Sequence, residues 1–157
     1  MAKISEIMLL QQPEQPALII ETTVNGMDEM SNAIGSGFMK IGAYLEESGE
    51  ITTDIPFVAY PCFEEMDETM IKMVIGFKLS KKLPHKGEIQ SIQLPAQKIV
   101  SCLHRGTYNE LADLYNEMTE WIKSKGYEAS GTSVEYYYTG PEYPESEHVT
   151  RVEMPLK

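Results

Sequence analysis

Apolar residues in the first half of the chain follow two spacings, one typical of strands and the other of helices. The β-branched run ALIIETTV at 17–24 predicts a strand, and residues 3–10 predict a shorter one before it. Ile34, Phe38, Ile41 and Leu45 recur at helical spacing and predict a helix from about 28 to 47, ended by Ser48-Gly49. Two more strands are expected at 55–63 and 69–79, forming a hairpin around the acidic stretch 64–68.

Glycines interrupt this predicted helix at positions 35, 37 and 42. Glycine weakens a helix interior, so its presence there usually has a packing reason. We therefore expect this helix to approach a neighbouring element closely.

The second half repeats the pattern. PAQKIVSCLHRG at 95–106 predicts a strand leading into a turn, and Thr107 with Glu110 has the spacing of a capping box. The helix that follows should end at Ser124-Lys125-Gly126. Its apolar face consists of Leu111, Leu114, Tyr115, Met118, Trp121 and Ile122, and further strands are expected at 133–138 and 148–156.

The order strand, helix, strand, strand thus occurs at 17–80 and again at 96–157. Two such units can join their sheets about a pseudo-twofold axis, which predicts an α+β fold with a mostly antiparallel sheet. No linker-like segment divides the halves, so residues 1–157 are expected to form a single domain. The seam between the units is a natural place for a pocket. Laying PFVAY over VEYYY places Phe57 at the position of Glu135.

Charge and motifs narrow the functional classes. The formal net charge is −11, and Lys81-Lys82 is the only basic pair, which disfavours direct binding to nucleic acid or to an anionic membrane. The cysteines Cys62 and Cys102 are expected to be free thiols in a cytoplasmic protein. The histidines lack the spacing of a metal site and no cofactor motif is visible, so no metal or cofactor is expected. Cys102 and His104 share a strand face, but no activating environment for a thiol nucleophile is visible.

The strand within GTSVEYYYTG carries one carboxylate among apolar and aromatic residues. Glu135 and Tyr137 point to one face, because side chains alternate along a strand. Either that face is solvated, or it lines a cavity in which Glu135 would be costly to ionise without a compensating cation. The sequence pattern leaves both interpretations open.

His104-Arg105-Gly106, Tyr108, Trp121 and Gly126 lie in a segment, 95–127, that resembles the second half of the GyrI-like effector-binding domains. These are small-molecule-binding modules of multidrug-sensing transcription regulators and also occur as stand-alone proteins. RVEMPL at 151–156 is similar to the family's final strand, and the resemblance covers nearly the whole chain. It implies two βαββ repeats in a curved antiparallel sheet, with two helices flanking a ligand cleft.

The resemblance also implies a binding site. Family members that bind many drugs hold a buried glutamate on the equivalent strand, and counting back from Arg151 places Glu135 there. Tyr137 could donate a hydrogen bond to Glu135 or stack on a ligand. The remaining candidates for the cleft are Phe38, Phe57, Tyr108, Trp121, Thr150 and Val152, for each of which ordinary packing or surface exposure is the alternative.

Three functions remain open. The first is a stand-alone protein that binds lipophilic, cationic or aromatic small molecules. The second is a hydrolase of strained cyclopropane-bearing genotoxins, in which Glu135 acts as general base or positions the water and Tyr137 donates to the leaving carbonyl. The third is an interaction with a protein partner, a regulator or DNA gyrase. The chain begins directly with the effector domain and shows no basic recognition helix, so a DNA-binding role has no support.

Overall fold

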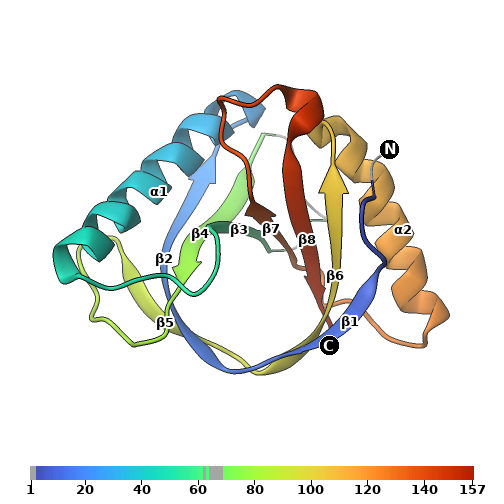
Figure 1. The fold of residues 1–157 in the computed structure, drawn as a ribbon, viewed down its shortest axis with the longest axis horizontal. Helices are drawn as coiled ribbons and strands as arrows, with labels where there is room; N and C mark the ends of the chain where they lie inside the picture. The colour runs from blue at the N-terminus through green and yellow to red at the C-terminus, as the bar shows by residue number, and fades with distance from the viewer. Residues whose placement is uncertain (1–2, 62, 64–68) are drawn as a thin grey trace.

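A computed structural model describes residues 3–61, 63 and 69–157. Figure 1 shows the helices α1 (Met27–Ser48) and α2 (Leu111–Ser124) on the two flanks of a curved sheet. Short 3₁₀ turns occur at Tyr108–Glu110 (η2) and Glu145–Glu147 (η3). The strands are β1 (Met8–Gln12), β2 (Gln15–Val24), β3 (Phe57–Tyr60), β4 (Ile71–Lys78), β5 (Gln90–Leu94), β6 (Gln97–Arg105), β7 (Ser133–Tyr137) and β8 (Val149–Pro155).

The strands form an antiparallel eight-stranded sheet in the order β1-β6-β8-β7-β3-β4-β2-β5. This order is symmetric about the pair β7 and β3, because β6-β8-β7 on one side corresponds to β2-β4-β3 on the other. The predicted pair of βαββ repeats and the α+β class are therefore confirmed.

The outer strands cross between the halves. β1 precedes β2 along the chain but pairs with β6, whereas β5 precedes β6 but pairs with β2. One register runs through both pairings, from Met8 opposite Ser101 to Ile19 opposite Gln90. The segments β1–β2 and β5–β6 thus form one continuous two-stranded ribbon, visible as the arc at the bottom of Figure 1.

Each helix buries its apolar stripe on its own half of the sheet. α1 covers β2 and β4, where Ile41 and Leu45 pack with Leu18 and Ile20. α2 covers β6 and β8 through a second apolar cluster. The face of the sheet that carries both helices is called the helix face below, and its middle strands β3 and β7 lie between the helices. The members of the α2 cluster are Val100, Cys102, Leu111, Leu114, Met118, Ile122, Val152, Met154 and Leu156.

The close approach expected of the helical glycines holds for one of them. A Cβ on Gly37 would lie 2.8 Å from Ile75 Cδ1, so α1 can pack this closely on β4 only with glycine there. A Cβ on Gly35 or Gly42 would meet no atom within 4 Å, so for these positions the expectation was wrong.

Two other local expectations differ from the structure. The capping box does not form, because α2 begins only after the turn η2, and Thr107 Oγ1 contacts Glu110 Oε1 at 3.3 Å rather than a backbone amide. The edge strand β5 was not predicted from the sequence.

The acidic stretch 64–68 and Cys62 lie outside the described residues. Across the described ranges, no helix is long and apolar enough to cross a membrane.

Candidate functional site

One row of side chains crosses the helix face from β6 to β2 and has Glu135 near its centre. Directly opposite residues on antiparallel strands point to the same face, so the row can be followed from pair to pair. Glu135 lies opposite Val152 on one side and Val58 on the other. The complete row is Cys102, Val152, Glu135, Val58, Ile75 and Ile20. Glu135 is the only acidic residue in this row, at the seam of the two repeats.

Glu135 is buried, with 9% of its surface exposed. Its carboxylate is held by tyrosines from different elements: Tyr115 of α2 donates to Oε2, and Tyr137 donates to Oε1 at 2.9 Å. Within the ranges that the structure describes, no Lys, Arg or His forms an ion pair with it. Hydrogen bonds, rather than a positive charge, therefore stabilise this carboxylate.

The hydroxyl network extends across the seam. Tyr60 Oη of β3 lies 3.0 Å from Tyr137 Oη, and Tyr115 Oη also reaches Ser133 Oγ at 3.1 Å. The network therefore joins β3, β7 and α2 around Glu135, and both repeats contribute to it.

Burial controls the protonation of this group. Desolvation raises the pKa of Glu135, while the hydrogen bonds from Tyr115 and Tyr137 partly oppose the rise. Burial beside the carboxylate in turn raises the pKa of Tyr115 and Tyr137 well above the usual range, so both hydroxyls stay protonated. The arrangement is a carboxyl group that takes up a proton more readily than in water, among neutral donors.

Aromatic rings surround the network. Phe38 of α1 stands edge-on to Tyr137, with ring centroids 6.5 Å apart, and Tyr108 of η2 stands edge-on to it at 6.2 Å. Tyr108 also stacks on His148 at 5.3 Å while remaining 47% exposed. Phe38 and Tyr108 thus approach Tyr137 from different elements, as expected of residues that line a common site.

The last strand supplies the neighbouring positions. Val152 lies directly opposite Glu135, and Thr150 lies directly opposite Tyr137. Both are buried on the helix face. The structure therefore brings Glu135, Tyr137, Phe38, Tyr108, Thr150 and Val152 together.

Phe57 does not belong to this group. Val58, not Phe57, is opposite Glu135, and Phe57 is opposite Tyr136 on the other face of the sheet. There it packs against Ile19 and Tyr136. The sequence overlay was wrong by one residue, and a shift of one residue moves a side chain to the opposite face.

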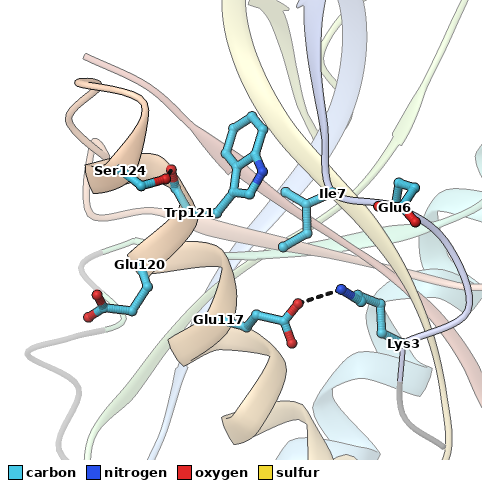
Figure 2. A pocket seen from close by; sticks show the side chains of 7 residues that line it. All are labelled: Lys3, Glu6, Ile7, Glu117, Glu120, Trp121 and Ser124. Carbon is cyan, nitrogen blue, oxygen red and sulfur yellow. Dashed lines mark hydrogen bonds and ion pairs between the residues drawn. The ribbon is translucent and has the colours of Figure 1, made fainter.

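Trp121 is also remote from Glu135. It lines a separate groove of about 360 Å³ between α2 and the N-terminal segment, beside Ile7 (Figure 2). The ion pair of Lys3 Nζ with Glu117 Oε2, at 2.5 Å, crosses this groove. The sequence correctly placed Trp121 on the same apolar stripe of α2 as Tyr115. The two residues nevertheless lie more than a helical turn apart, so Trp121 does not reach the site around Glu135.

Tyr115, Tyr60 and Ser133 contact the network and were not among the predicted site residues. A signal for Tyr115 was present, since it is the only residue of the predicted α2 stripe with a hydroxyl group. Tyr60 follows Val58 by two positions in β3, so it could have been found once the register across the seam was known.

Cys102 lies on the helix face beneath α2 and is buried. Burial raises the pKa of its thiol, which disfavours the reactive thiolate. The described environment of Cys102 therefore gives no support to a thiol nucleophile.

Comparison with known proteins adds a family and several related folds. The family model described as the GyrI-like small molecule binding domain matches residues 5–157. The EcmrR C-terminal domain superposes with a TM-score of 0.80 at 20% identity, covering 97% of this chain and 97% of that one. Against the EcmrR chain in its complex with DNA, this chain spans 57% of the length. A search of curated proteins found no match.

Two further structures share the fold. A hydrolase encoded by lin2189 from Listeria innocua has a TM-score of 0.75 at 11% identity, covering 99% of this chain and 93% of that one. SAV2435, solved bound to tetraphenylphosphonium, has a TM-score of 0.64 at 14% identity, with coverage of 98% and 94%. At these identities the likeness is one of fold. The family assignment comes from the sequence model, and since that model spans residues 5–157, the chain belongs to the GyrI-like family of small molecule binding domains.

Proposed function

We propose that this domain binds lipophilic cations and related aromatic molecules between its helices, with Glu135 opposite the positive charge. The observation that carries the proposal is the buried carboxylate of Glu135, which has tyrosine donors but no ion-pair partner among the described residues. A buried carboxylate without a countercharge is costly to ionise, and a bound cation would remove that cost. The solved complex of SAV2435 with tetraphenylphosphonium supports this class of ligand.

The surroundings suit such a ligand. Phe38, Tyr108 and Tyr137 present aromatic rings near the carboxylate, and each favourable cation–ring contact contributes about 0.5–2 kcal/mol. The net charge of −11 also favours the approach of cations over anions. The hydroxyls of Tyr115 and Tyr137, which stay protonated, can orient the carboxylate without competing for the positive charge.

The test is calorimetric titration with tetraphenylphosphonium and with its isosteric anion tetraphenylborate, from acidic to alkaline pH. Ionised Glu135 is the form that attracts a cation, so wild-type affinity for the phosphonium should rise with pH through the pKa of Glu135. Glu135→Gln should weaken phosphonium binding by about tenfold or more, equivalent to about 1.4 kcal/mol, and flatten the pH dependence.

The control is Glu21→Gln, which removes the same charge from an exposed position in β2 and should bind as wild type does. Phosphonium binding that is unaffected by Glu135→Gln, or stronger binding of the borate, would contradict the proposal.

A second candidate function is hydrolysis of strained cyclopropane-bearing compounds at the same site. The observation that favours it is the pairing of Glu135, whose pKa is raised by burial, with the protonated donor Tyr137 at 2.9 Å. A carboxyl group of raised pKa suits general acid–base work near neutral pH. Turnover of a cyclopropane-bearing substrate that is lost in both Glu135→Gln and Tyr137→Phe would establish it. Binding of that substrate without product formation in the wild type would exclude it.

A further inference from the structure

His104 and Thr150 carry polar atoms that the described part of the chain leaves without a partner. His104 is 0% exposed and Thr150 is 1% exposed, and neither ring nitrogen of His104 nor Oγ1 of Thr150 has a hydrogen bond within the described residues. Buried polar groups in folded proteins are nearly always hydrogen-bonded, so each such exception needs an explanation.

These residues adjoin the proposed cation site. His104 lies directly opposite Thr150, and Thr150 lies directly opposite Tyr137. Tyr137 is in turn two residues from Glu135 in β7 and hydrogen-bonded to it. His104, Thr150 and Tyr137 therefore form a second row on the helix face, next to the row that contains Glu135.

The chemistry of this row is neutral. Burial lowers the pKa of His104, which favours an imidazole with one donor and one acceptor nitrogen. The hydroxyl of Thr150 can also donate or accept. Side chains directly opposite each other on antiparallel strands have Cβ atoms about 4.5–5.5 Å apart, so one oxygen atom between them can bond to both.

We propose that His104 and Thr150 form a subsite for a neutral oxygen of the ligand, a hydroxyl or a carbonyl, while the ligand's positive charge lies at Glu135. This inference rests on the proposed cation site and specifies its ligand class: lipophilic cations that carry a hydrogen-bonding oxygen at a distance from the charge. Tyr108, which is about half exposed and edge-on to Tyr137, lies at the same end of the site.

The experiment compares two probes of equal charge and nearly equal shape. They are triphenylphosphonium cations whose fourth substituent is a para-hydroxyphenyl or a para-methylphenyl group. Wild-type protein should bind the hydroxyl probe about tenfold more tightly, because that probe satisfies buried groups that the methyl probe leaves unpaired. In Thr150→Val, which keeps the shape of the side chain, the ratio of the affinities should fall to about three, because His104 alone remains to bond to the probe's hydroxyl.

The remaining variants and readouts separate the possible outcomes. Thr150→Ser keeps a hydroxyl and should keep the preference, as should Thr23→Val, the same substitution at an exposed position of β2. Nitrogen NMR of His104 should show a ring shift with the hydroxyl probe and none with the methyl probe. Equal wild-type affinities for both probes, as expected if water alone satisfies His104 and Thr150, would overturn this inference but not the cation site. Failure of tetraphenylphosphonium itself to bind would overturn both.

Discussion

Glu135 and its tyrosine donors form a coupled unit, in which each side chain alters the protonation of the next. The pKa of Glu135 is raised by burial and restrained by donors, chiefly Tyr115 and then Tyr137. A carboxyl group whose folded-state pKa is raised stabilises the protein below its unfolded pKa, and this contribution is lost as pH rises through the folded pKa. Glu135 therefore contributes less to the stability of the wild type at neutral pH than in acid.

Removing the Tyr115 hydroxyl should increase this loss. Tyr115→Phe takes away the donor to Oε2, so the pKa of Glu135 should rise further and its ionised form should become costlier. We expect the destabilisation relative to wild type to grow with pH across the titration of Glu135, to about 1.5–3 kcal/mol, as for hydrogen bonds to charged groups. Urea unfolding at a series of pH values measures it. Tyr143→Phe, at an exposed tyrosine, is the control, and a destabilisation independent of pH would contradict the prediction.

At the residue scale, the sequence was enough to identify six of the residues that the structure brings together at the site, but not the three hydroxyl-bearing residues Tyr115, Tyr60 and Ser133. Alternation along one strand was enough to place Glu135 and Tyr137 on one face. Phe57 was misplaced because the register across the seam depends on pairing between distant strands, which a local overlay does not determine. Tyr115 was seen as an apolar helix position, but its direction towards Glu135 depends on how α2 lies on the sheet.

At the scale of elements, the position of α1 depends on how closely its backbone approaches β4. Gly37 lies against Ile75, which belongs to the same row as Glu135. Phe38, the next residue, contacts both Phe77 and Tyr137. The glycine thus sets the depth at which Phe38 reaches the site.

Alanine substitutions at the helical glycines should therefore change the stability of the protein in opposite directions. Gly37→Ala places a methyl group 2.8 Å from Ile75 Cδ1 and should destabilise the protein by about 1–3 kcal/mol through overpacking. Gly35→Ala and Gly42→Ala meet no atom within 4 Å and should stabilise it by about 0.5–1 kcal/mol, through higher helix propensity. Chemical denaturation of the three variants measures the differences. Equal effects at all three positions would show that helix propensity alone matters.

Elements with strong periodicity were predicted well, and those defined by tertiary contacts were not. The helix expected at 28–47 is observed at Met27–Ser48, because its apolar spacing and its glycine stop are local signals. β5, with the sequence QSIQL, contains few β-branched residues. It is a strand because it pairs with β2, which precedes it by more than 60 residues in the chain. The capping box failed because the chain forms a 3₁₀ turn before α2.

At the scale of the whole molecule, the repeats are not independent halves. β3 pairs with β7 at the seam, and the ribbon of β1–β2 with β5–β6 joins them again at the other end. On the face opposite the helices, Arg151 of the second repeat forms an ion pair with Asp54 of the first, with Nη2 and Oδ2 at 2.6 Å. Each repeat therefore completes the sheet of the other.

Cutting the chain between β4 and β5 tests this interdependence. Fragment 1–84 lacks β5 and β7, which pair with its β2 and β3, and fragment 85–157 lacks β1 and β3, which pair with its β6 and β7. Neither fragment should therefore show native circular dichroism alone. Mixed in equal amounts, they should form a one-to-one complex that recovers the native spectrum and the binding of tetraphenylphosphonium. Light scattering with size-exclusion chromatography measures the stoichiometry. A natively folded, monomeric single fragment would contradict the prediction.

The row through Glu135 has a consequence for how such a protein could have evolved. The symmetric counterpart of Glu135 is Val58, which is also the residue directly opposite Glu135 across the pseudo-twofold axis. If two identical subunits had built this sheet, exact symmetry would have placed either two valines or two glutamates side by side, giving no charge or a repelling pair. Joining the copies in one polypeptide let the sequences diverge, so that a single carboxylate could be retained at an axis where a homodimer allows only none or two.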